Sequence, residues 1–192
     1  MIRTENFAQV EVTSGDALHR WLLDHHAQME SVWLVTFKKS EPDKYLDRFA
    51  VLDELLCFGW IDGIRRKLDD ARTMQLISPR KEQTWAQTYK DRVARLRAEG
   101  RMHPAGEAAI AHSKELGKWD EMADVDALIV PDDLLAALQA YAPADVHFTN
   151  FSPSSRRNML RWLKQAKTGP TRVKRIAQIA TLAARNEKVP QM

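Results

Sequence analysis

The stretch Phe58-Gly59-Trp60-Ile61-Asp62-Gly63 marks the change from helix to strand that decides the fold of this 192-residue chain. Residues 44–57, which precede it, are apolar almost all round at helical spacing, and this pattern predicts a deeply buried helix. Gly59 ends the helix, because glycine readily takes the left-handed conformation common after a last helical turn. From Trp60 to Leu68 we predict a strand, so a buried helix passes directly into a sheet.

A second strand is predicted from Thr73 to Ser78, beyond the polar turn Asp69-Asp70. Antiparallel pairing across this turn places residue 62 roughly opposite residue 78. Arg80 then lies at the same end of the hairpin as Trp60 and Asp62. The hairpin therefore gathers charged and aromatic residues at one end.

The segment 32–37, Val-Trp-Leu-Val-Thr-Phe, is apolar on both faces and predicts a central strand. Helical patterns fill most of the remaining chain, and two amphipathic helices flank the break at Thr168-Gly169-Pro170. We expect an α+β fold, with a small antiparallel sheet of about three strands surrounded by helices and a C-terminal helical pair. Residues 1–150 form the expected core domain, and residues 151–192 form a basic helical pair packed on the same domain.

Composition excludes several classes of protein. The single cysteine, Cys57, cannot form an internal disulfide, and its apolar neighbours indicate a small buried hydrophobe. The N-terminus lacks the pattern of a signal peptide, and apolar runs fall far short of the ~20 residues that a membrane span needs. Histidine spacing, glycine spacing and hydroxyl motifs fit no metal, phosphate-loop or nucleophile signature. We therefore expect a cytoplasmic protein without membrane insertion, metal, cofactor or catalytic residue.

Charge is unevenly distributed along the chain. Residues 101–150 carry 3 basic and 9 acidic residues, whereas residues 151–192 carry 10 basic and 1 acidic residue. Such a basic end can bind a polyanion such as nucleic acid, or it can pack against the acidic stretch 107–133. The candidate polyanion-binding residues lie on the outward positions of the last two helices: Arg156, Arg157, Arg161, Arg172 and Arg175.

The end of the hairpin is the candidate ligand-binding site. A carboxylate is disfavoured in a strand, so the presence of Asp62 in this strand indicates a specific structural or functional role. The interpretation that we favour is a structural ion pair with Arg80 or Arg66, with the tryptophans as core. There are two alternatives: a site for a small anionic or planar ligand, and acid–base catalysis by Asp62. The candidate ligand-binding residues are Trp60, Asp62, Arg66, Arg80, Lys81 and Trp85.

These residues also carry a family resemblance. The chain resembles the YdeI/OmpD-associated family of bacteriocin-protection proteins from about Trp21 to Lys188. Two positions differ from the family pattern, which tends to have Ser and Asn where this chain has Ala86 and Tyr89. The similar segments are Leu55-Leu56-Cys57-Phe58-Gly59-Trp60-Ile61-Asp62-Gly63, Pro79-Arg80-Lys81, Trp85, Arg92-Val93, Leu96, Gly100-Arg101-Met102-His103-Pro104-Ala105-Gly106, Ser154-Ser155-Arg156-Arg157, Arg161-Trp162, Ala166-Lys167 and Thr171-Arg172-Val173-Lys174-Arg175-Ile176.

The resemblance implies association with an outer-membrane porin and tolerance of antibacterial peptides or proteins, without an established reaction. The function that we favour is therefore a non-enzymatic binding or stress-protection protein. Its partner would be an unknown protein or a small anionic ligand. The alternatives are a nucleic-acid-associated protein that uses the basic C-terminal helices, and an enzyme with Asp62 as general acid or base.

Overall fold

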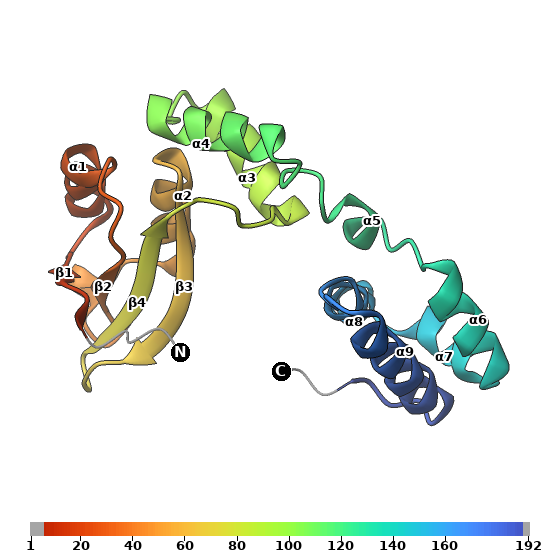
Figure 1. Ribbon diagram of the computed structural model, residues 1–192. Helices are drawn as coiled ribbons and strands as arrows, with labels where there is room; N and C mark the ends of the chain where they lie inside the picture. The colour runs from red at the N-terminus through yellow and green to blue at the C-terminus, as the bar shows by residue number, and fades with distance from the viewer. Residues whose placement is uncertain (1–5, 190–192) are drawn as a thin grey trace. The chain divides into compact units, whose positions relative to one another are not determined.

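The computed structural model of the protein describes residues 6–189. The chain divides into two compact units, Met1–Asp120 and Glu121–Met192 (Figure 1). Each unit has its own hydrophobic core. The division differs from the expected boundary at residue 150, because residues 122–151 contribute to the same core as the last two helices.

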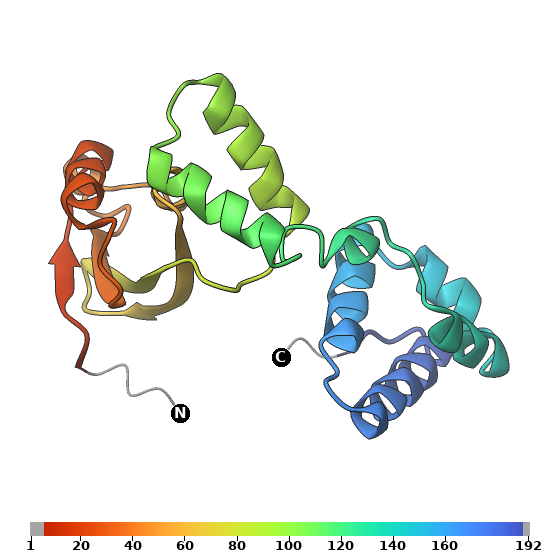
Figure 2. The same cartoon turned by 45° about the horizontal axis from the view of Figure 1, so that its top comes forward.

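The N-terminal unit contains a sheet and four α-helices within the described residues. Its strands and helices follow one another as β1 (Gln9–Glu11), α1 (Gly15–His25), β2 (Val32–Phe37), a 3₁₀ turn (Pro42–Lys44), α2 (Arg48–Cys57), β3 (Trp60–Lys67), β4 (Arg72–Pro79), α3 (Gln87–Ala98) and α4 (Pro104–Glu115). The buried helix, the hairpin and the central strand β2 were all predicted at these places. Figure 2 shows how α3 and α4 follow the hairpin.

The sheet has four strands in the order β1-β2-β4-β3, so the expected count of three is wrong. It is also mixed, because β1 runs parallel to β2 while the other pairs are antiparallel. The three residues of β1 are too few to show an alternating pattern, which explains why the sequence does not reveal it. The α+β class itself is confirmed.

The hairpin register differs by one residue from the prediction. Asp62 pairs with Ile77, and Ile61 pairs with Ser78. The pairing is irregular between Asp62 and Arg65, as in a β-bulge. Side chains three residues apart normally point to opposite faces of a strand, but an inserted residue changes that alternation. Asp62 and Arg65 can therefore face the same side.

One apolar core joins the sheet to the helices of the N-terminal unit. Leu34 and Ile77 of the sheet share this core with Leu22 of α1 and Leu55 of α2, and all four side chains are fully buried. Helix α2 also packs against α3, α4 and β3. Because α2 is covered on so many sides, its apolar residues extend almost all round, as predicted.

The second unit consists of helices within the described residues. They are α5 (Ala123–Asp126), α6 (Asp132–Ala140), α7 (Ala144–Asn150), α8 (Pro153–Lys164) and α9 (Gly169–Ala184). Helix α9 packs against α6, α7 and α8, so the expected C-terminal helical pair is present with further helices around it. Across both units, the helices of residues 6–189 are too short or too polar to cross a bilayer.

Candidate functional site

Asp62 of β3 is held by two neutral side chains rather than by an arginine. The Tyr89 hydroxyl donates to Asp62 Oδ1 at 2.8 Å, and Gln75 Nε2 donates to Asp62 Oδ2 at 3.3 Å. The expected ion pair with Arg80 or Arg66 is wrong, since no salt bridge of Asp62 occurs within residues 6–189. Of these two partners, the Tyr89 hydroxyl lies closer to the carboxylate.

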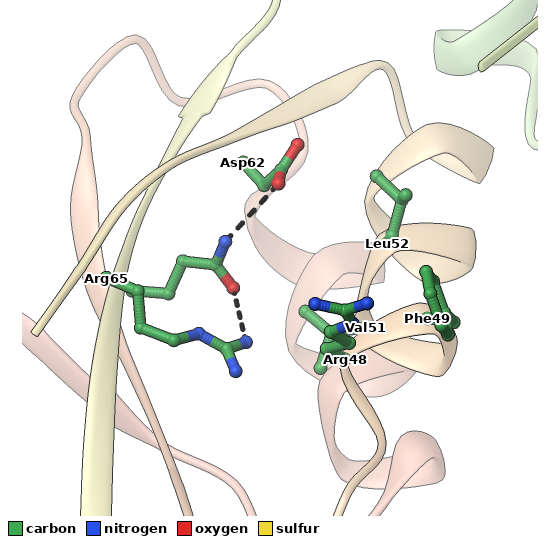
Figure 3. A pocket seen from close by; sticks show the side chains of 7 residues that line it. Arg48, Phe49, Val51, Leu52, Asp62 and Arg65 are labelled. Carbon is green, nitrogen blue, oxygen red and sulfur yellow. Dashed lines mark hydrogen bonds between the residues drawn. The ribbon is translucent and has the colours of Figure 1, made fainter. Parts of the chain in front are cut away.

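Asp62 lines a cavity of about 450 Å³ between α2 and the hairpin. Figure 3 shows the side chains from α2 on one side and those from the strands on the other. Gln75 links Asp62 with Arg65, the other charged residue of β3 in this cavity, because its Oε1 accepts a hydrogen bond from Arg65 Nη2 at 2.8 Å. The cavity is lined by Arg48, Phe49, Val51, Leu52, Asp62, Arg65 and Gln75.

Two cations in this cavity form no salt bridge within the described residues, although Arg48 contributes weakly, after the hydrogen bond from the Phe49 N–H, to the lowered pKa of the neighbouring Asp47. The guanidinium of Arg48 lies 4.5 Å from the centre of the Phe49 ring, and Arg65 donates to the neutral Gln75. Neither residue forms a salt bridge in the described part of the chain, although other arginines of this unit do. The paired arginines are Arg72, Arg92, Arg95, Arg97 and Arg101. The cavity therefore keeps unneutralised positive charge beside one carboxylate.

The tryptophans of the predicted site belong to the core instead of an open cleft. Trp60 and Trp85 are 0% and 1% exposed, and Arg80 is 7% exposed. The Arg80 guanidinium lies 3.9 Å from the Trp85 ring centre, a cation–π contact. Burial lowers the pKa of Arg80 to about 10, and its Nε and Nη2 have no hydrogen-bond partner in residues 6–189. These three residues therefore support the hairpin end from inside.

Lys81 and Arg66, the remaining predicted ligand-binding residues, lie outside the lining of the cavity. Lys81 is exposed in the loop after β4, and Arg66 stacks over Trp33 with 5.3 Å between guanidinium and ring centre. From the sequence, Asp62 was selected among the cavity residues, and Arg65 or Arg66 was considered beside it before Arg66 was chosen. The choice between these two arginines depends on the bulge of β3. Arg48 was missed, because it lies in helix α2, away from the hairpin in the sequence.

The basic C-terminal helices are partly neutralised by acidic residues of the same unit. Arg172 donates two hydrogen bonds to Asp133, at 2.6 and 2.8 Å, and this pairing lowers the pKa of Asp133. Lys164 donates to Asp124 at 2.5 Å. Both carboxylates belong to the acidic stretch 107–133, so the predicted alternative of packing against that stretch is partly realised.

The other candidate polyanion-binding residues have differing surroundings. Arg175 donates to the Trp162 carbonyl and stacks over its ring, and the Arg156 guanidinium lies 5.7 Å from the Phe148 ring centre. Arg157 and Arg161 form no salt bridge within the described residues. Of the five candidates, only Arg172 is therefore paired with a carboxylate within the described residues.

The single cysteine, Cys57, does not add a reactive thiol to the candidate site. Cys57 is buried at the end of α2, and burial raises the pKa of its thiol to about 11. The thiol is thus protonated at neutral pH and is not a ready nucleophile. Within residues 6–189, no group of three or more His, Cys, Asp or Glu side chains is arranged to hold a metal ion.

Two family models match different parts of the chain. The model described as "Bacteriocin-protection, YdeI or OmpD-Associated" matches residues 127–186, which confirms the resemblance to that family. The hairpin lies instead within residues 10–109, which match a second model. No curated protein and no solved structure matches the chain with significance. Since this second match covers more than half of the 192 residues, the chain belongs to the family described as "Domain of unknown function (DUF8412)".

Proposed function

We propose that this chain is a non-enzymatic binding protein that takes a small anionic ligand in the cavity of Asp62. The observation that supports this proposal is the pair Arg48 and Arg65, which line one cavity and form no salt bridge within the described residues. A guanidinium presents several N–H donors in a planar fork that matches the oxygens of a phosphate or carboxylate. A cavity of about 450 Å³ also lies within the usual size range of small-molecule sites.

Besides the anionic group that the arginines require, Asp62 places a second requirement on the ligand. Its carboxylate repels a simple anion but accepts hydrogen bonds from a ligand that also carries an ammonium or amide group. Tyr89 and Gln75 hold the carboxylate in place, and its position in the lining leaves it accessible to a ligand. The preferred ligand thus combines an anionic group near the arginines with a hydrogen-bond donor near Asp62.

Isothermal titration calorimetry with inorganic phosphate and with phosphoethanolamine tests this assignment. Arg48→Ala and Arg65→Ala should each weaken both ligands, whereas Arg97→Ala, which alters an exposed ion pair with Glu107, should weaken neither. Asp62→Asn should weaken phosphoethanolamine and strengthen phosphate, because it removes both an acceptor of the ammonium group and a repulsive charge. Equal binding by wild type and the Arg48 and Arg65 variants would contradict the proposal.

The cellular role that we propose is protection against antibacterial peptides or proteins, exerted from the cytoplasm. The match of residues 127–186 to the bacteriocin-protection family supports this role. Bacterial cells that produce the chain should survive a bacteriocin challenge better than cells that lack it. The Arg48→Ala variant should lose this advantage at equal protein level if ligand binding is required, and Arg97→Ala should keep it.

A further inference from the structure

A second cavity of about 450 Å³ adjoins the Asp62 cavity, and the two share a wall. Arg48 and Arg65 line both, so the guanidinium groups that attract an anion in one cavity are also reached from the other. The second cavity opens where β2 ends and α2 begins. Its lining consists of Thr36, Phe37, Lys38, Lys39, Tyr45, Leu46, Asp47, Arg48, Arg65 and Thr73.

The second cavity adds positive charge to the shared arginines. Lys39 is exposed, its Nζ lies 5.8 Å from the Tyr45 ring centre, and it forms no salt bridge within the described residues. Lys38 is committed to the hairpin turn, where its Nζ donates to the carbonyls of Asp69 and Asp70 at 2.7 and 3.0 Å. Besides the two shared arginines, Lys39 is therefore the cation of the second cavity that can bind a ligand.

The one carboxylate that lines the second cavity already accepts hydrogen bonds from the protein itself. Asp47 caps α2, because its Oδ1 accepts the Phe49 N–H at 2.8 Å, and its Oδ2 accepts from the Tyr45 hydroxyl at 3.3 Å. The hydrogen bond from Phe49 is the main reason that the pKa of Asp47 lies below its ordinary value. Asp47 thus serves the helix end, and Lys39 keeps its charge for a ligand.

We propose that the two cavities form one groove that binds a linear ligand with at least two phosphate groups. The first phosphate lies between Arg48 and Arg65, and the next reaches Lys39. The proposal rests on the proposed function, since it starts from the same arginine pair. It specifies the ligand as a phosphate chain, because the arginines line both cavities and Lys39 lines only the second, so one ligand that spans both cavities needs more than one anionic group.

Calorimetry with inorganic phosphate, pyrophosphate and tripolyphosphate at constant ionic strength tests the groove. Affinity should rise about tenfold from phosphate to tripolyphosphate in the wild type, as more charge-assisted contacts form. Lys39→Ala should weaken tripolyphosphate about fivefold and leave phosphate within about twofold. The matched control is Lys114→Ala, since Lys114 is also an exposed lysine beside an aromatic ring, that of Trp119, and neither residue lines the two cavities.

The outcomes separate this inference from the proposed function. If Arg48→Ala and Arg65→Ala weaken phosphate but tripolyphosphate binds no tighter than phosphate, the extended groove is wrong and the anion site stands. The same conclusion holds if Lys39→Ala and Lys114→Ala weaken tripolyphosphate equally, because general charge attraction then explains the gain. If neither arginine variant affects any of the three ligands, both proposals are overturned.

Discussion

Replacing Gly106 by alanine should destabilise the N-terminal unit by more than a surface helix substitution does. Gly106 is buried in α4, where an added Cβ would lie 2.2 Å from the Cys57 carbonyl oxygen and 2.8 Å from the Cys57 carbonyl carbon. Both are backbone atoms, so no side-chain rotation can relieve the overlap. The end of α2 and the start of α4 would have to separate, although close packing leaves little room for such movement.

The expected loss follows from two opposing effects. Overpacking of a well-packed interior costs about 1–3 kcal/mol. Alanine favours a helix over glycine by about 1 kcal/mol, which offsets part of that cost. Because the overlap with Cys57 involves backbone on both sides, we take the upper end and expect a net loss of about 2 kcal/mol in the free energy of unfolding.

Urea unfolding followed by tryptophan fluorescence measures this loss. Five of the six tryptophans lie in the N-terminal unit, so the signal reports mainly on the unit that contains Gly106. Gly100→Ala is the control in the same unit, because a Cβ there meets no atom within 4 Å and costs only the strain of φ +69°, about 1 kcal/mol. A Gly106→Ala protein that unfolds at the wild-type urea concentration would refute the close contact between α4 and Cys57.

Three further substitutions test the site and the second unit. Tyr89→Phe removes the hydroxyl that donates to Asp62, so urea unfolding should show a loss of about 1 kcal/mol. Arg80→Met should change the free energy of unfolding by less than about 1 kcal/mol, because loss of the Trp85 contact and of the long Nη1 hydrogen bonds to the Gln83 and Thr84 carbonyls is offset by removal of a buried cation whose Nε and Nη2 are unpartnered; a loss above about 2 kcal/mol would contradict this. Arg172 lowers the pKa of Asp133 below 3.8, so their interaction stabilises the fold above that pH and is lost as pH falls through the lower folded pKa. Asp133→Asn should therefore flatten the acid side of the stability profile, measured by circular dichroism, and an unchanged profile would show that the pair contributes nothing.

The hairpin was predictable because its signals are local. Gly59 adopts φ +74° after α2, which is the left-handed conformation expected at a helix end. The turn at Asp69-Asp70 and the apolar pattern of residues 32–37 likewise depend on short stretches of chain. The three-residue strand β1 and the one-residue register difference at Asp62 were not predictable, because they depend on pairing between distant segments.

The candidate site shows the same limit more clearly. The sequence placed Arg80 near Asp62, and the Asp62 charge does raise the pKa of Arg80 slightly against the larger effect of burial. The guanidinium, however, lies over the Trp85 ring. Arg48, in contrast, comes near Asp62 only because α2 packs against β3. Sequence spacing shows which residues share a helix or strand. It does not show which of the side chains gathered at the end of the hairpin reaches the cavity.

The sequence by itself determined that Phe58–Gly63 joins a buried helix to a strand, and that the chain is an α+β protein. Both follow from side-chain periodicity and from the backbone freedom of Gly59. Only the tertiary structure decided that Asp62 pairs with Tyr89 and Gln75, and that Arg48 of α2 lines the same cavity as Asp62 and Arg65 of β3. The reason is that these contacts join two helices, two strands and a bulge, and their geometry exists only after those elements have packed together.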